Sequence, residues 1–162
     1  ITLKKGQVLV RQGEVCKHLY FMTKGSLRCF EIDPNGREVN HHFYFEDELA
    51  SEFKSLQSQE PSDRNLVVMS PGMALRSYRN DYLPLLENNT EFLQSAFRFF
   101  QELFFQEEER TNMLRKLTTE ERYLYVLANQ PHLLQRISLT QLASWLGISR
   151  ESLSRIRNKI AN

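Results

Sequence analysis

The sequence predicts an α+β protein in which a small antiparallel β-barrel or roll is followed by a long helix and then by a module of short helices. Three observations predict this organisation. Short runs of β-branched and aromatic residues, separated by turn residues, occupy the first 78 positions. A long amphipathic helical pattern follows over roughly residues 89–116. Two capping signatures then mark the starts of short helices.

The predicted strands are short and regularly spaced, which is typical of a small antiparallel barrel or roll. The sharpest turn signal between them is Asp33-Pro34-Asn35-Gly36. Lys24-Gly25-Ser26 and Ser70-Pro71-Gly72 are predicted turns as well. The polar stretch from Glu46 to Arg64 interrupts the spacing and predicts a long binding loop. The predicted strands are residues 7–10, 18–22, 27–32, 39–45, 65–69 and 73–75.

The predicted long helix is apolar on two sides. A helix of this kind needs two partners, and a second copy of the chain, packed as in a coiled coil, is an economical choice for one of them. Burial in a single intramolecular core is the alternative. We expect a homodimer through residues 92–114, with the polar residues 106–110 marking a hinge or the end of tight packing. The two apolar stripes are Leu93, Phe97, Phe100, Phe104 and Leu114, and Phe92, Ala96, Phe99 and Leu103.

Composition excludes several classes of protein. The chain has 162 residues, of which 41% are hydrophobic and 25% charged, as in a soluble globular protein. No apolar run is long enough to span a membrane. The two cysteines, Cys16 and Cys29, are too few for a disulfide scaffold and favour the cytoplasm. We expect no metal or cofactor and no enzymatic activity, because phosphate-binding loops, nucleophile elbows and metal-spaced clusters are missing from the sequence.

Charge is distributed unevenly along the chain. Residues 1–117 contain 15 Lys and Arg and 17 Asp and Glu, whereas residues 118–162 contain six basic and three acidic residues. A small basic segment after a mildly acidic body suggests a module that binds a polyanion.

Three short helices are predicted at the C-terminal end of the chain. Thr118 and Glu121 form a capping box at the start of the first helix. Pro131 is predicted to end that helix. Ser138 and Gln141 form a second capping box, which begins the next helix.

The last two of these helices predict a helix–turn–helix over residues 138–160. Gly147 ends the first helix, and Ser149 caps the second, which begins at Arg150. The apolar positions fit two helices that cross closely. The residues predicted to point inward are Leu142, Ala143, Leu146, Ile148, Leu153, Ile156 and Ile160.

The outer face of the second helix has the chemistry needed to bind DNA. Arginine can donate two hydrogen bonds to guanine O6 and N7, and glutamate can accept one from cytosine N4. A capping serine at a helix N-terminus can hold a phosphate, and basic residues further along add nonspecific attraction. A helical hairpin with a solvated charged face is the alternative. The predicted DNA-binding residues are Ser149, Arg150, Glu151, Ser154, Arg155, Arg157 and Lys159.

Residues 148–156 (Ile-Ser-Arg-Glu-Ser-Leu-Ser-Arg-Ile) resemble the recognition-helix signature of the Crp/Fnr superfamily. These are bacterial transcription factors of the catabolite-activator and fumarate–nitrate-regulator types. The order of the predicted elements also resembles this family, so the resemblance covers nearly the whole chain. The segments similar to its β-roll are 5–14, 19–22 and 25–28, and those closest to its Bacteroidetes-type branch are 133–136 and 143–147.

The resemblance implies three domains. Residues 1–88 are expected to form an antiparallel β-roll of the cyclic-nucleotide-binding, cupin-like type, residues 89–117 a dimerisation helix, and residues 118–162 a helix–turn–helix DNA-binding domain. It also implies a cytoplasmic homodimer that binds a palindromic operator in double-stranded DNA, with RNA polymerase as a further partner. In each half-site Glu151 and Arg155 would read the G·C pair of a TGA-like core, and Ser154 favours TTGA over GTGA.

In this family the β-roll can bind a cyclic nucleotide through a Gly-Glu pair and an Arg-Ser/Thr-Ala run. Here Glu48 matches the glutamate, but Asp47 stands in place of the glycine. Ser62 and Arg64 are the remaining candidate effector-binding residues, and the small residues expected after the arginine are absent. Carboxylates crowd this loop and would repel a cyclic phosphate. We therefore expect cyclic AMP binding to be absent or weak, and a small-molecule effector stays unidentified.

A second function fits the same pattern. The β-roll could be a ligand-binding sensor module, similar to those for cyclic nucleotides, whose helical tail docks a protein partner and not DNA. Salt dependence separates the two functions, because DNA binding through several phosphates weakens steeply as salt rises.

Overall fold

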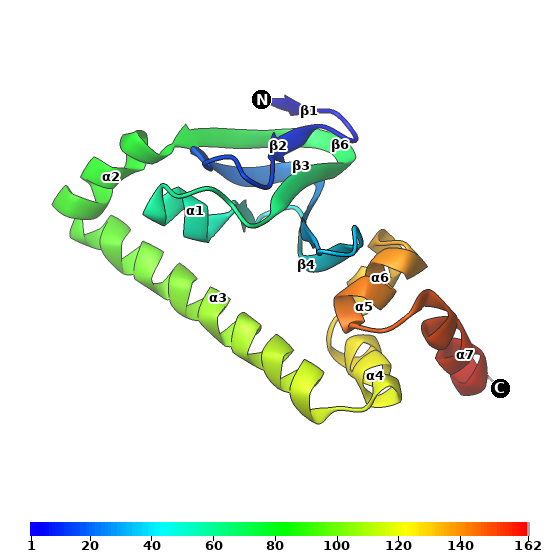
Figure 1. Ribbon diagram of the computed structural model, residues 1–162. Coiled ribbons are helices and arrows are strands. Elements are labelled where there is room, and N and C mark those ends of the chain that lie inside the picture. The colour runs from blue at the N-terminus through cyan, green and yellow to red at the C-terminus, as the bar shows by residue number, and fades with distance from the viewer. Residues whose placement is uncertain (162) are drawn as a thin grey trace. The chain divides into compact units, whose positions relative to one another are not determined.

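The computed structural model describes residues 1–161. They form two compact units, Ile1–Leu93 and the residues from Gln94 on, and each is described by itself (Figure 1). The first unit contains β1 (Thr2–Leu3), β2 (Val8–Val10), β3 (His18–Ile32), β4 (Glu38–Tyr44), β5 (Leu49–Ala50), α1 (Phe53–Ser58), β6 (Asn65–Tyr78) and α2 (Arg79–Asn88). Helix α3 (Thr90–Lys116) leads into the second unit, which contains α4 (Thr119–Asn129), α5 (Pro131–Arg136), α6 (Leu139–Leu146) and α7 (Arg150–Ala161).

The first unit is built on an antiparallel sheet, as predicted, and the strand order is β1-β6-β3-β4. Strand β2 also pairs with β6, and β5 pairs with β3, so the two long strands organise the sheet (Figure 1). Side chains on one face of these strands form the core, where Met22, Leu27 and Leu66 are fully buried. Alternation of buried and exposed positions is what a half-buried strand produces.

Strands β3 and β6 are much longer than the sequence predicts, at 15 and 14 residues. The turns predicted at residues 24–26 and 70–72 are wrong, because both segments lie inside these strands. The pairing register shifts around Lys24 and Ser26, and Gly25 has a φ of +92°. Glycines inside strands mark bulges or close backbone approaches as well as turns, so composition alone does not distinguish these cases.

Gly72 makes the closest of these approaches, and its replacement tests the paired strands. An added Cβ would lie 1.9 Å from the carbonyl oxygen of Lys24, on the partner strand. We expect Gly72→Ala to destabilise the protein by about 1–3 kcal/mol or more, because two backbones must separate. Thermal unfolding measures this. In the comparison variant Gly36→Ala nothing lies within 4 Å of the new Cβ, so only the strain of a φ of +77° remains and the loss of stability should be smaller. Equal loss of stability in the two variants would contradict the close approach.

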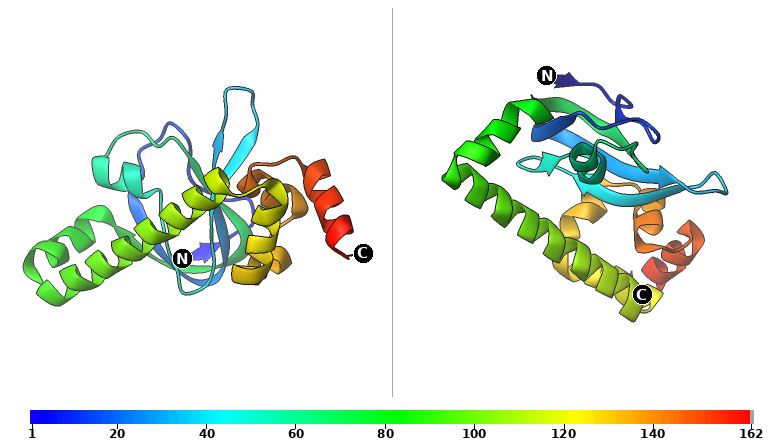
Figure 2. Two further views of the ribbon diagram at one scale, coloured as in Figure 1. Left: turned by 90° about the horizontal axis from the view of Figure 1, so that it is seen from below. Right: turned by 60° about the vertical axis from the view of Figure 1, so that its left-hand side comes forward.

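The predicted turn at Asp33–Gly36 is confirmed, and it joins β3 to β4. The Asp33 carboxylate accepts hydrogen bonds from the backbone N–H groups of Asn35, at 2.8 Å, and Arg37, at 2.9 Å. These bonds, with the Arg37 N–H leading, lower the pKa of Asp33. Gly36 has a φ of +77°, which glycine adopts without strain. Figure 2 shows the tip of this hairpin extending beyond the rest of its unit.

The segment from Glu46 to Arg64 is more ordered than the predicted long loop. It contains β5 and α1, and a buried Leu56 fixes the helix to the core. The Glu52 carboxylate caps α1 by accepting from the Ser55 N–H at 2.9 Å. A helix this short carries too few periodic positions to be recognised from its sequence.

The chain between the sheet and the long helix also forms a helix, α2, which the sequence analysis does not predict. Pro84 lies inside it, where proline is unfavourable, and this obscures the pattern. The long helix α3 spans nearly the predicted range. Asn89 caps it by accepting from the Phe92 N–H at 2.9 Å.

Four short helices follow α3, where three were predicted. Gln130 ends α4 and also precedes α5, in which Pro131 is the first residue, so this proline begins a helix as well as ending one. The capping boxes predicted at Thr118 and Ser138 are both confirmed. Among the helices within residues 1–161, none combines the length and the apolar character that crossing a membrane requires.

Candidate nucleic-acid interface

The junction between α6 and α7 is a tight turn with a cap on each side. Gly147 ends α6 in the left-handed conformation, with a φ of +67°, as predicted. Ser149 begins α7, and its Oγ accepts from the Ser152 N–H at 3.1 Å. These contacts set the direction in which α7 leaves the turn.

The inner side of α7 is held by the predicted apolar positions. Leu153 is fully buried, as is Leu146 on α6, and Ala143 is 2% exposed. A small residue at this position lets two helices approach closely. The prediction for Ile160 is wrong, since 38% of this residue is exposed, one residue before the helix ends at Ala161.

The outer side of α7 brings four of the predicted residues together. Arg150, Glu151, Ser154 and Arg155 occupy neighbouring positions on its first two turns, because residues three or four apart are neighbours on a helix surface. The two arginines and the glutamate are exposed, and Ser154 is half-buried. Arg155 Nη2 lies 3.4 Å from the Ser152 hydroxyl. This face presents donors and an acceptor in positions from which they can read base edges.

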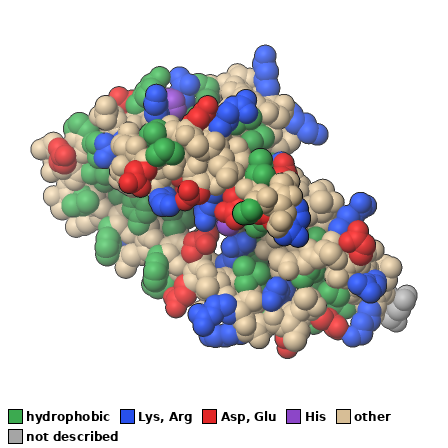
Figure 3. All heavy atoms as spheres, in the orientation of Figure 1, with side chains coloured by type: hydrophobic (Ala, Val, Ile, Leu, Met, Phe, Trp, Pro, Cys, Tyr) green, Lys and Arg blue, Asp and Glu red, His purple; other side chains and the backbone are tan. Residues whose placement is uncertain are grey.

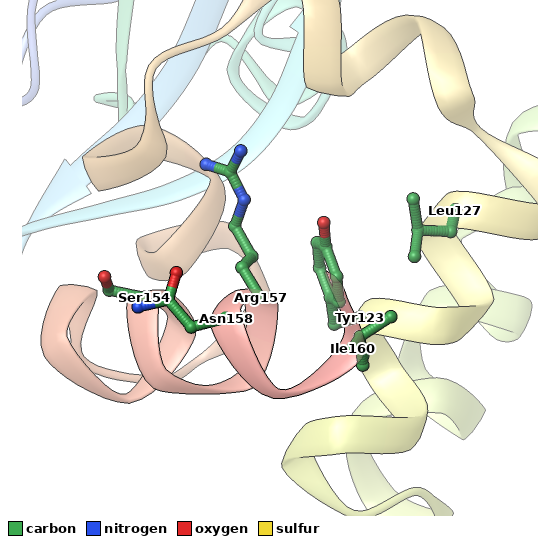
Figure 4. Close-up of a pocket in the computed structure, with 6 residues that line it drawn as sticks. All are labelled: Tyr123, Leu127, Ser154, Arg157, Asn158 and Ile160. Atoms are coloured by element: carbon green, nitrogen blue, oxygen red, sulfur yellow. The ribbon is translucent and has the colours of Figure 1, made fainter. Parts of the chain in front are cut away.

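Arg157 and Lys159 lie further along α7 and have different surroundings. Arg157 extends into a pocket of about 410 Å³ between α7 and α4, opposite Tyr123 (Figure 4). Lys159 Nζ forms an ion pair with the Glu120 carboxylate on α4 at 2.7 Å. The side chains of Lys159 and Glu120 are 69% and 40% exposed, so solvent screens the pair and it contributes little stability. The remaining residues of the pocket are Leu127, Ser154, Asn158 and Ile160.

The acidic residues near this face are mostly engaged in local contacts. Glu120 is paired with Lys159. Glu121 accepts hydrogen bonds from the backbone N–H and the hydroxyl of Thr118, both at 2.8 Å, and these bonds lower the pKa of its carboxyl. Glu151 is the acidic residue on α7 itself. Figure 3 shows Lys and Arg side chains exposed on the surface around these helices.

The candidate effector residues make local contacts in the first unit. Glu48 Oε2 accepts from the Phe45 N–H at 2.9 Å. The Ser62 hydroxyl donates to the Arg64 carbonyl at 2.8 Å and accepts from the Arg64 N–H at 3.0 Å. In the part of the chain that the structure describes, no hydrogen bond or ion pair joins Glu48 to Ser62 or Arg64. Two of the three polar groups therefore stabilise their own turns.

The carboxylates of the same loop also have structural partners. Glu46 accepts from the Gly25 N–H at 2.9 Å. Asp63 pairs with Lys54 at 2.6 Å, and the hydrogen bond and charge of this lysine lower the pKa of the aspartate. Asp47 has a φ of +65°, in the region that glycine favours. Within residues 1–161, no three His, Cys, Asp or Glu side chains form a group that could hold a metal ion.

Two further residues near the interface, both arginines, were counted above only among the basic residues. Arg110 on α3 and Arg122 on α4 donate to backbone carbonyls at the end of α6. The sequence contains little information about these hydrogen bonds, because the acceptors are main-chain carbonyls, which every residue provides.

The fold is that of bacterial transcription regulators of the Crp/Fnr type. FixK2 from Bradyrhizobium japonicum superimposes with a TM-score of 0.84 at 14% identity, over 99% of this chain and 83% of that one. A CRP-family transcriptional regulator from Thermus thermophilus gives 0.75 at 18% identity, over 99% and 84%. The c-di-GMP-responsive global regulator CLP of Xanthomonas campestris gives 0.70 at 19%, over 99% and 85%.

The family follows from the sequence of the first unit. Residues 1–89 match the cyclic nucleotide-binding domain family, and the chain belongs to this family. A comparison with curated proteins finds no significant match. At identities this low, the similarity to the solved regulators shows a shared fold.

Proposed function

We propose that the chain is a DNA-binding transcriptional regulator of the Crp/Fnr type. In this proposal residues 1–88 are a sensor domain, residues 89–117 a dimerisation helix and residues 118–162 a helix–turn–helix domain. The observation that carries the proposal is the group Arg150, Glu151, Ser154 and Arg155 on the first turns of a helix whose inner side is buried; the two arginines and the glutamate are exposed, and Ser154 is half-buried. Such a regulator works in the cytoplasm, where bacterial DNA lies.

The chemistry of α7 suits the major groove. Arg155 can donate to guanine, and Glu151 can accept from the paired cytosine. Together they would read the G·C pair of a TGA-like half-site core. Ser149 and the first backbone N–H groups of the helix can hold a phosphate. Arg157 and Lys159, toward the C-terminal end of the same helix, can also contact phosphates. Ser154 favours a TTGA core, and Arg150 can contact either bases or phosphate.

A homodimer through residues 92–114 is the second part of the proposal. Helix α3 exposes large apolar side chains, among them Phe97 at 63% and Phe104 at 66% (Figure 3). A second copy of the chain covers this surface, because a two-fold axis places the same apolar stripe on both sides of the contact. The two recognition helices then enter successive major grooves roughly 34 Å apart, so the operator is a palindrome.

Two finer parts of the proposal follow from the sequence resemblance. RNA polymerase is the expected protein partner at promoters. The resemblance of residues 133–136 and 143–147 to the Bacteroidetes-type branch of the superfamily favours that branch for this chain.

The first prediction concerns the base-reading residues. We expect Glu151→Ala and Arg155→Ala each to cost about 1–3 kcal/mol of binding free energy and to relax the preference at one base pair. Lys159→Ala is the control, because a phosphate contact has no base preference and its loss weakens all sequences equally. Affinities for single-base variants of the operator measure this. Unchanged sequence preference in both alanine variants would contradict the assignment.

The alternative function, a sensor module whose helical tail docks a protein, gives a different salt response. For a protein that contacts six to ten phosphates, DNA affinity falls on the order of 10³–10⁵-fold between 50 and 200 mM salt. A steep linear fall in log affinity with log salt concentration supports DNA binding. A flat response in a chain that still binds a protein would favour the alternative.

The second prediction concerns the effector. We expect cyclic AMP and cyclic GMP to bind weakly or not at all, because Glu48 and Ser62 already have local hydrogen-bond partners and acidic residues crowd the loop. Calorimetric titration of the purified chain measures this. Binding at micromolar concentrations of either nucleotide would overturn the prediction and identify the effector class.

A further inference from the structure

Arg122 connects the end of one helix to the end of another. Its Nη2 donates to the carbonyl oxygen of Leu114 at 2.7 Å, and its Nε to that of Leu117 at 3.1 Å. Its Nη1 donates to the carbonyl oxygen of Leu146 at 2.9 Å. Each nitrogen of the guanidinium therefore donates to the backbone, and the acceptors lie at the ends of α3 and α6.

Helix C-termini are suitable acceptors for such a group. The last carbonyls of a helix have no partner within it, and the aligned peptide dipoles give this end a partial negative charge. The planar guanidinium places its donors in a fixed fork, and hydrogen bonds from a charged donor are roughly twice as strong as neutral ones. Arg122 is half-buried, so solvent competes less for these bonds.

The end of α6 has a hydrogen-bond partner for each of its last carbonyls. The backbone N–H groups of Gly147 and of the residue after it, both in the turn, donate hydrogen bonds to the two earlier of these carbonyls. The carbonyl of Trp145 accepts from Arg110 at 3.4 Å, and that of Leu146 accepts from Arg122. Side chains from α3 and α4 thus supply the partners that α6 itself cannot.

The residues of α3 that contact α6 lie in the last turns of α3. The Arg110 guanidinium lies 5.3 Å from the centre of the Trp145 ring, and Met113, 3% exposed, is the buried residue of α3. Residues 106–108, one turn earlier, are exposed. The change from exposed to buried side chains occurs near Arg110, well before the helix ends at Lys116.

We propose that Arg122, together with Arg110, is a positioning residue that fixes α6, and through it α7, to the last turns of α3. This inference rests on the proposed DNA-binding function. The junction at residues 116–118 is then not a free hinge. The last turns of α3 set the direction of α7. A signal that reorients α7 therefore acts on the part of α3 that precedes Arg110 in the sequence.

The spacing between half-sites tests this role, because it depends on orientation and a change in stability alone does not alter it. The full chain and its Arg122→Gln variant are titrated against the selected palindrome, the same palindrome with two base pairs inserted at its centre, and a single half-site. We expect Arg122→Gln to lower the discrimination between the two palindromes by about tenfold or more, since hydrogen bonds from charged groups are lost. Affinity for the single half-site should stay nearly unchanged.

Two matched variants accompany the test. Arg115→Gln removes an exposed arginine of α3 and should keep the wild-type discrimination. Arg122→Lys keeps the charge but lacks the planar fork, and we expect it to resemble Arg122→Gln. A lysine variant with full discrimination would overturn the role of the fork. Trp145, the single tryptophan of the chain, reports by its fluorescence whether the end of α6 is intact in each variant.

The outcomes separate the two proposals. A wild-type chain that selects no palindrome would overturn the DNA-binding function and this inference with it. A wild-type chain that selects one, with Arg122→Gln retaining the spacing preference, would overturn the positioning role alone. If Arg122→Gln does not fold, Arg110→Gln replaces it, because that change removes the hydrogen bond to the Trp145 carbonyl and the contact with the Trp145 ring.

Discussion

Phe97→Glu is expected to convert the proposed dimer to a monomer and to lower the affinity for a palindromic operator by about 10²–10⁴-fold. Two linked half-site contacts exceed a single one by that factor. Phe97 is 63% exposed in the single chain and lies in the middle of the longer apolar stripe of α3. In the dimer the new carboxylates would meet across the two-fold axis in apolar surroundings, where burial of an unpaired charge is costly. Sedimentation and fluorescence anisotropy with a labelled duplex measure the two effects.

Arg98→Glu is the matched control. Position 98 lies on the side of α3 opposite the two apolar stripes, so a glutamate there stays in solvent. The control variant should remain a dimer and keep most of its affinity. A Phe97→Glu chain that still sediments as a dimer would show that α3 is not the dimer interface.

Leu153→Ala is expected to destabilise the second unit by about 2–5 kcal/mol, the usual cost of removing a buried leucine side chain. Leu153 is fully buried and seats the proposed recognition helix on α6. Urea denaturation followed by the fluorescence of Trp145, in the same unit, measures the change. Ile160→Ala is the comparison on the same helix, and the loss there should be much smaller, because 38% of Ile160 is exposed. Equal losses in the two variants would contradict this packing.

Local signals predicted much of the second unit correctly. The capping boxes at Thr118 and Ser138 involve residues three apart, and Gly147 ends α6 through its own backbone conformation. Interactions over so few residues depend little on the rest of the fold. The exposed group on α7 was predicted for the same reason, since the period of a helix fixes which residues share a side. Its role in DNA binding stays a prediction.

Contacts between distant residues explain what the sequence analysis missed. Gly25 and Gly72 looked like turn residues, yet they allow two long strands to approach each other. The pattern of glycines is the same in both cases, and pairing decides between them. Glu46 looked like part of an acidic surface, yet it accepts from the Gly25 N–H, 21 positions away. The role of Arg122 was missed for the same reason, because its acceptor, the carbonyl of Leu146, is 24 positions away in the sequence.

Selection of binding sites from random duplex DNA by the purified chain tests the proposed DNA-binding function. It is run with no effector and again with cell extract, beside the Glu151→Ala and Arg155→Ala variants. We predict enrichment of a palindrome with a TGA-like core by the wild-type chain, and a relaxed preference at one base pair in each variant. Enrichment only with extract would mean that an effector is required. No enrichment under either condition would contradict the account and favour a helical tail that docks a protein.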